Sequence, residues 1–200
     1  MKKILFLLAL LSANVYAADV EKTQAQLLST FTNGCSKCIT AQNIRDLTVS
    51  TVGSAPMGEV SYFNTTGTSV TIGSSSDGTT NMVKIAPITT GNFMMQTDNG
   101  GADNGRLRYT GTLTKTFHIA VTTSGTPATA NDVFVMGVAK NGAVVASTKV
   151  LGSASGTQFS ALHAMITLAT NDYIELFVGN TTAGRNITIK SLNMFMLGMQ

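Results

Sequence analysis

The sequence predicts an all-β protein, an antiparallel β-sandwich of about eight to ten short strands that follows a short helical N-terminal arm. After Met57, short stretches of alternating apolar and polar residues recur, and connections rich in Gly, Ser, Thr and Asn separate them. No strong helical pattern follows Ser50. Hydrophobic residues make up 44% of the 200 residues, enough for a buried core, whereas charged residues make up only 12%. We therefore expect a surface dominated by uncharged polar residues.

The N-terminal segment 1–17, MKKILFLLALLSANVYA, has the layout of a bacterial secretory signal peptide. Lys2 and Lys3 form a basic start, an apolar run follows, and cleavage is expected after Ala17. The run is shorter than the roughly 20 apolar residues that a membrane-spanning helix needs. The alternative is a retained hydrophobic helix, buried in an oligomer or anchored in a bilayer.

Residues 18–56 are expected to form an N-terminal arm. Apolar residues between Val20 and Phe31 recur at spacings of three and four, which predicts a short helix. Thr40 is a candidate cap for a second short helix. The sequence GSAP at 53–56 breaks the pattern, so the arm is expected to end there and a single domain to occupy residues 57–200.

The arm carries the chain's two cysteines, Cys35 and Cys38, in the sequence NGCSKC. A zinc site needs four ligands, and the two histidines, His118 and His163, are lone residues in expected strands. A redox site of the thioredoxin type needs a strand before the motif, but a turn sequence stands there. In an exported chain, a local disulfide between Cys35 and Cys38 is the expected state. Free thiols are the default if the protein assembles in the cytosol, and a metal or redox role is the remaining alternative.

The expected strands follow one another from Met57 to the C-terminal region. They are MGEVSYF, TSVTI, MVKIAPI, RLRYTGTLTKTFHIAV, VFVMGVAK, AVVASTKVL, FSALHAMITL, YIELFVG and NITIKSLNMFML. Asn141 and Gly142 join two of them, because this pair tolerates the positive φ angles of a type I′ hairpin turn. The segments QTDNGGADNGRL and TTSGTPATAND are expected to be loops. Because a single sheet of such strands would expose its edges, we expect two sheets packed as a jelly roll.

The sequence contains no recognisable catalytic site. There is no nucleophile elbow, and the acidic residues Glu59, Asp132, Asp172 and Glu175 all have structural interpretations. We therefore expect no enzyme activity, no catalytic residues and no cofactor. The net charge of +3 comes without a basic run, so nucleic acid is not an expected partner.

One loop, TDNGGADNG at 97–105, is a candidate ion site. Asp98, Asn99, Asp103 and Asn104 could supply oxygen ligands. Their spacing does not match the helix–loop–helix calcium pattern, so a flexible surface loop is the preferred interpretation and no metal ligand is assigned.

The order of motifs resembles the trimeric jelly roll shared by complement collagen-like proteins and tumour-necrosis-factor ligands. The motifs are TGTL at 110–113, KNG at 140–142, LATNDYIEL at 168–176 and the C-terminal ITIKSLNMFMLGM. The resemblance implies a homotrimer, with Met194 and Met196 in the core or the subunit interface and Phe195 on the opposite face. The aromatic residues expected after Gly111 are absent, and so is a collagen stalk, which puts a complement-like or cytokine-like role in doubt.

A second resemblance concerns the setting. ITAQNIRDLTVSTV followed by GEVSYFNTTGTSVTI is similar to the lead-in of phage head-fibre, tail-fibre and related virion proteins. It implies a non-enzymatic structural protein of a virion surface, with itself, capsid or tail proteins and a host-surface glycan or receptor as partners. A signal peptide is unusual in such a protein. The alternative is therefore an exported bacterial adhesin or glycan-binding module of the same fold, in the periplasm or outside the cell.

Overall fold

A computed structural model of the chain describes residues 55–101, 105–153 and 155–199. Within these residues, twelve β-strands form two antiparallel sheets, and one 3-10 turn, η1 (Ala146–Thr148), interrupts them. Three of the strands contain only two residues, so nine longer strands remain, in line with the expected number. The predicted signal peptide, the helical arm and the cysteines Cys35 and Cys38 lie outside the described residues.

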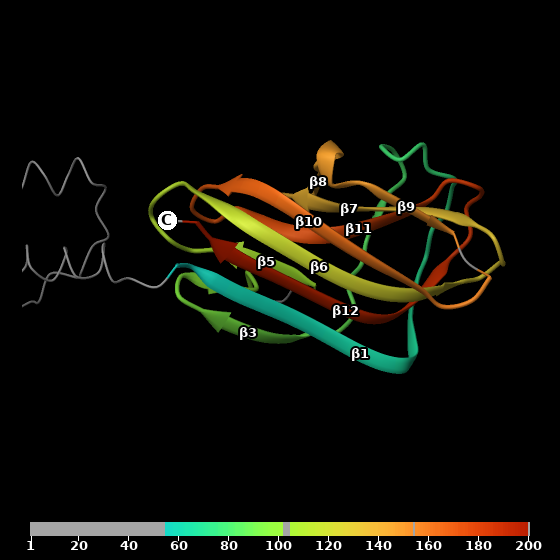
Figure 1. The fold of residues 1–200 in the computed structure, drawn as a ribbon, viewed down its shortest axis with the longest axis horizontal. Coiled ribbons are helices and arrows are strands. Elements are labelled where there is room, and N and C mark those ends of the chain that lie inside the picture. The colour runs from blue at the N-terminus through green and yellow to red at the C-terminus, as the bar shows by residue number, and fades with distance from the viewer. Residues whose placement is uncertain (1–54, 102–104, 154, 200) are drawn as a thin grey trace, which may run out of the picture. The chain divides into compact units, whose positions relative to one another are not determined.

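The first sheet, sheet A, contains five strands that lie side by side in Figure 1. Their order is β10 (Gln158–Leu168), β6 (Lys115–Pro127), β12 (Ile187–Gly198), β1 (Met57–Val70) and β3 (Thr90–Met94). Every neighbouring pair is antiparallel. The strands β10 and β3 therefore form the two edges of sheet A.

The second sheet, sheet B, contains seven strands. They are β4 (Thr97–Asp98), β5 (Arg106–Tyr109), β11 (Tyr173–Asn180), β7 (Val133–Lys140) and β8 (Ala143–Val144), with β2 (Val83–Lys84) paired to β11 and β9 (Val150–Ser153) paired to β7. The chain crosses between the sheets after β5, β6, β9, β10 and β11. This alternation between two packed antiparallel sheets is a jelly roll, as predicted.

The core lies between the two sheets and is filled by alternate residues of each strand. Phe117 and Ile119 of β6 are fully buried, and the ring of Phe117 meets that of Tyr109 edge to face at a centroid distance of 4.9 Å. Met194 and Met196 are also fully buried, whereas Phe195 between them is only half-buried on the opposite face. The methionines of β12 are therefore core residues, one of the two roles expected for them.

Two expected strands, MGEVSYF and TSVTI, form the single long strand β1. Its pairing with β12 shifts register between Phe63 and Thr68. The Asn64 carboxamide oxygen accepts hydrogen bonds from the N–H groups of Thr66 (2.8 Å) and Gly67 (3.2 Å), and Gly67 has a φ of 82°. The polar residues that suggested a loop therefore form a bulge inside a continuous strand.

The expected strand RLRYTGTLTKTFHIAV is wrong as a single element, because it forms β5 and β6 in different sheets. The chain changes sheet at Gly111, where an added Cβ atom would lie 2.3 Å from the Tyr109 hydroxyl. The strand β6 also extends to Pro127, into a segment expected to be a loop, because Gly125 pairs with both Gln158 and Ile189.

The segment around the Asn-Gly hairpin follows the prediction only in part. Asn141 and Gly142 have φ angles of 52° and 79°, which confirms a turn with two positive φ values between β7 and β8. The strand expected next is divided into β8, η1 and β9, because the Thr148 hydroxyl donates to the Val145 carbonyl (2.7 Å) and accepts from the Val138 N–H (2.9 Å). Similarly, only Val83 and Lys84 of MVKIAPI form a strand.

Candidate functional site

The face of sheet A that points away from the core, called here the outer face, is the candidate functional site. Cross-strand pairing arranges its side chains in rows. One row holds Met94, Met57, Leu197, His118 and Met165; the next holds Asn92, Glu59, Phe195, Ala120 and His163; then come Thr90, Ser61, Asn193, Thr122 and Ala161, followed by Phe63, Ser191, Ser124 and Phe159.

Large apolar side chains are exposed on this outer face. The exposed fractions are 78% for Phe63, 81% for Phe159, 56% for Met165 and 45% for Met94. In the four rows, Glu59 is the only Asp, Glu, Lys or Arg residue, and its carboxylate accepts a hydrogen bond from the Asn193 amide. Exposed aromatic and methionine side chains with few charges are typical of a contact surface.

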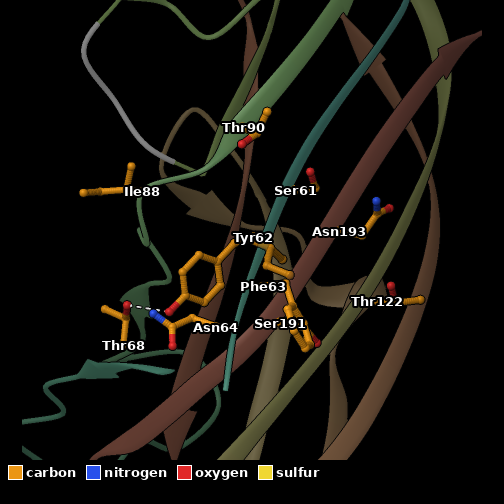
Figure 2. Close-up of a pocket in the computed structure, with 11 residues that line it drawn as sticks. Ser61, Tyr62, Phe63, Asn64, Thr68, Ile88, Thr90, Thr122, Ser191 and Asn193 are labelled. Carbon is orange, nitrogen blue, oxygen red and sulfur yellow. Dashed lines mark hydrogen bonds between the residues drawn. The ribbon is translucent and has the colours of Figure 1, made fainter. Parts of the chain in front are cut away.

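A groove of about 660 Å³ opens at the β1 edge of this face, shown in Figure 2. It forms because β3 pairs with β1 only from Met57 to Ser61, so the edge of β1 beyond Ser61 is not covered by β3. The groove is lined by Ser61, Tyr62, Phe63, Asn64, Thr68, Ile88, Thr90, Thr122, Ser191, Leu192 and Asn193. None of these residues is charged, and the Tyr62 and Thr68 hydroxyls share a hydrogen bond of 2.8 Å.

A second hollow of about 330 Å³ continues the groove towards β10. It shares Thr122 and Ser191 with the first and reaches the side chain of Phe159. The hydroxyls of Ser124 and Ser191 are 2.6 Å apart between the two hollows. Two exposed aromatic rings, Phe63 and Phe159, therefore flank a strip of hydroxyl groups. Such a surface can stack on apolar faces and exchange hydrogen bonds, but it offers no general acid or base.

The structure brings together the two histidines that the sequence presents as isolated residues. His118 on β6 and His163 on β10 lie on the outer face with their Nε2 and Nδ1 atoms 3.0 Å apart. Their rings are nearly parallel, at 15°, with centroids 5.2 Å apart. The expectation that they are poor partners is wrong, because the register of β10 against β6 places them on one face. Only that register could have revealed the pair, and it cannot be read from either strand alone.

Acidic residues outside the rows are committed to structural contacts. Glu175 of β11 is buried and forms ion pairs with Lys84 (2.8 Å) and Arg106 (3.0 Å), and the Arg106 guanidinium stacks on Tyr173 at 3.8 Å. Among the residues described by the structure, no group of three or more His, Cys, Asp or Glu side chains could hold a metal ion.

Two aspartates order the loops at opposite ends of β11. Asp132 is buried and accepts hydrogen bonds from Arg185 Nε (2.8 Å) and Asn180 Nδ2 (2.8 Å), and the Arg185 guanidinium holds the pKa of Asp132 below its usual range. Burial opposes ionisation of Asp172, but hydrogen bonds from Lys140, Asn141 and the backbone outweigh it and lower its pKa. Both carboxylates are therefore charged partners in fixed networks.

The candidate ion loop is largely accounted for by pairing. Asp98 belongs to β4 and receives both Arg108 Nε (2.8 Å) and Arg108 Nη2 (2.7 Å), and this contact lowers the Asp98 pKa. Its carboxylate is thus already neutralised, and Asp103 and Asn104 lie outside the described residues. Within the described part of the chain, no helix has the length and apolar character needed to span a membrane.

No protein-family model matches the chain, and no curated protein matches it. Among solved structures, the PRD1 vertex protein P5 is 11% identical, with 74% of this chain and 99% of that chain covered at a TM-score of 0.44. Murine APRIL at pH 5.0 is 9% identical, with 72% and 98% covered at a TM-score of 0.44. Eiger TNF from S. frugiperda is 11% identical, with 74% and 94% covered at a TM-score of 0.40. Similarities this remote indicate no function, so the jelly-roll assignment rests on the strand order described above.

Proposed function

We propose that this protein is a non-enzymatic structural protein of a virion surface that assembles as a homotrimer through the outer face of sheet A. The observation that supports the proposal is the cluster of exposed apolar side chains there, with Phe63 and Phe159 each about four-fifths exposed. Burial of such residues is the main source of favourable free energy in subunit association. Other copies of the chain are the proposed occupants of this face.

The distribution of charge supports the same assignment. Sheet B and its loops carry the ion pairs of Glu175, Asp98, Asp132 and Asp172, whereas the rows of the outer face contain Glu59 alone. Charged residues are depleted in the cores of subunit interfaces, because burying a charge is costly unless it is paired. In the proposed trimer, sheet A faces the other copies and sheet B faces solvent.

The N-terminal segments have proposed roles in this setting. The arm at 18–56 would tie the 57–200 domain to a capsid or tail protein, and the domain would decorate the particle or contact the host. Several copies would make weak single contacts strong together. Segment 1–17 is proposed to be either a cleaved leader or a retained anchor, and Cys35 and Cys38 are proposed to form a local disulfide in an exported chain.

Intact mass under native and denaturing conditions tests the proposal. The expected result is a native mass three times the denatured mass, with the same chain present in purified particles at many copies. A stable monomer across micromolar concentrations would overturn the trimer. A trimer that starts after Ala17, is two hydrogens lighter than the reduced chain and is absent from particles would overturn the virion setting.

A second candidate function is that of an exported adhesin or glycan-binding module. The groove in Figure 2 favours it, because an uncharged lining of hydroxyl and amide groups beside Tyr62 and Phe63 is suited to a neutral oligosaccharide. Binding to a neutral glycan array should be lost in Phe63→Ala and kept in Leu151→Ala, an equally apolar exposed residue on sheet B. Equal binding by both variants would exclude the groove as the glycan site.

A further inference from the structure

Two imidazoles and a thioether meet near the β10 edge of the outer face. His118 Nε2 and His163 Nδ1 are 3.0 Å apart. Met165 is directly opposite His118 across the β6–β10 pair and follows His163 by two residues, so all three side chains share one face. Met165 is 56% exposed, and packing in the described domain does not explain its position.

We propose that His118, His163 and Met165 form a binding site for a copper ion. Imidazole nitrogens suit copper, zinc and nickel, and a thioether favours copper, above all Cu(I). Of the divalent ions, copper also binds nitrogen ligands more tightly than nickel or zinc does. The site is independent of the proposed assembly and of the groove, neither of which requires histidine.

The nitrogen separation fits two bonds to one ion. Metal–nitrogen bonds of about 2.0–2.1 Å at right angles to each other place the two nitrogens about 2.9 Å apart. The distance between His118 Nε2 and His163 Nδ1 is 3.0 Å. Without an ion, one of these nitrogens carries a proton and donates it to the other. Copper binding therefore needs the donor ring to move that proton to its second nitrogen, after which both lone pairs face the ion and the rings stay neutral.

The surroundings suit a bound cation that stays accessible. No Lys or Arg stands in the two rows that contain the three residues, and the nearest carboxylate in those rows, Glu59, lies three strands away on β1. No cation on these rows repels the ion, and no carboxylate competes for it at close range. Two or three protein ligands also leave coordination positions for water or for a neighbouring copy of the chain.

The first experiment titrates Cu²⁺ into the full-length protein. Because thiolates at Cys35 and Cys38 would bind copper themselves, the background is the Cys35→Ser/Cys38→Ser chain without an affinity tag that contains histidine. The expected result is one Cu²⁺ per chain by calorimetry, with nitrogen hyperfine splitting from two imidazoles in the electron paramagnetic resonance spectrum. His163→Ala should weaken binding by roughly tenfold or more, since loss of an outer partner alone costs about that much. Thr167→Ala, on the same face of β10, should not.

A second measurement separates copper from other ions. Met165→Leu should weaken Cu⁺ in competition with a chromogenic chelator, while Ni²⁺ affinity is unchanged, because nickel does not depend on the thioether. Equal Cu⁺ affinity in wild type and Met165→Leu would overturn the thioether as a ligand.

The histidine variants decide the site as a whole. Cu²⁺ affinity that is unchanged in His163→Ala, or the absence of saturable binding in the parent chain, would overturn the site. His163 is exposed on an edge strand, so this variant is expected to fold, and an unchanged circular dichroism spectrum and melting temperature check that it does. His118→Ala is then a second test of the same outcome, and its folding does not affect the conclusion from His163→Ala.

Discussion

Replacing Phe159 by Ser tests whether the outer face holds copies of the chain together. The Phe159 side chain is 81% exposed on β10 and points away from the core. A phenylalanine side chain presents about 200 Å² of surface, so about 160 Å² is available for burial by another copy. At about 25 cal/mol per Å², full burial would contribute about 4 kcal/mol and half burial about 2 kcal/mol.

The assay is sedimentation equilibrium over a range of protein concentrations. A loss of about 2 kcal/mol per contact raises the dissociation constant of that contact by about 30-fold, and a loss of about 4 kcal/mol raises it by nearly 1000-fold. Phe159→Ser should therefore sediment as a monomer at concentrations where the parent chain is trimeric. The melting temperature of the isolated monomer should not fall, because the replaced ring contributes almost nothing to the core.

The matched control is Leu151→Ser. Leu151 is 71% exposed on β9 of sheet B, so the substitution removes similar apolar surface from the opposite sheet. The control should assemble like the parent. The reasoning is refuted if Phe159→Ser remains trimeric, or if both variants dissociate to the same extent, because either result would show that the outer face of sheet A is not the specific contact.

Further predictions concern stability. Asp132→Ala should lower the free energy of unfolding by about 3 kcal/mol in urea denaturation, because it leaves the Asn180 amide and the Arg185 guanidinium without their shared acceptor. The lowered pKa values of Asp132 and Asp172 give stability that is present above the unfolded-state pKa of about 3.9 and is lost as the pH falls through the lower folded-state values. Urea midpoints should therefore be level from neutral pH down to about 5 and drop below about 4, and Asp132→Asn should flatten that drop; a profile as steep as the parent's would contradict this. Gly67→Val should cost about 1–3 kcal/mol, because φ is 82° and an added Cβ would lie 2.6 Å from Thr188 Cγ2, whereas Gly73→Val, with open space around it, should cost less.

The strands could be predicted from the sequence wherever one face is buried. Phe117, Ile119 and Val121 alternate because every second residue of β6 enters the core, and the same pattern holds for Leu162, Ile166 and Leu168. The crossing at Gly111 was missed because alternation continues across it, so the local pattern contains no sign that the chain changes sheet.

The candidate site was harder to predict, because it depends on which strands are neighbours. The groove exists because β3 pairs with β1 only as far as Ser61, and the histidine contact exists because β10 pairs with β6 in one register. A shift of one residue would move His163 to the core side of the sheet and separate it from His118. Sequence patterns show which residues of a strand share a face, but not which residue of another strand lies opposite.

The exposed aromatic and methionine side chains are unlikely products of folding requirements alone, and the composition of sheet B shows why. Both sheets fill the same core with alternate residues, so the outward positions of either sheet are free to be polar. On sheet B those positions include Lys84, Arg106 and Glu175, joined in ion pairs. On sheet A they include Phe63, Phe159 and Met165, which add nothing to the core and increase the risk of non-specific association. A difference of this kind between two sheets of one domain indicates that sheet A is selected for contact, and the Phe159→Ser and Leu151→Ser pair measures that difference directly.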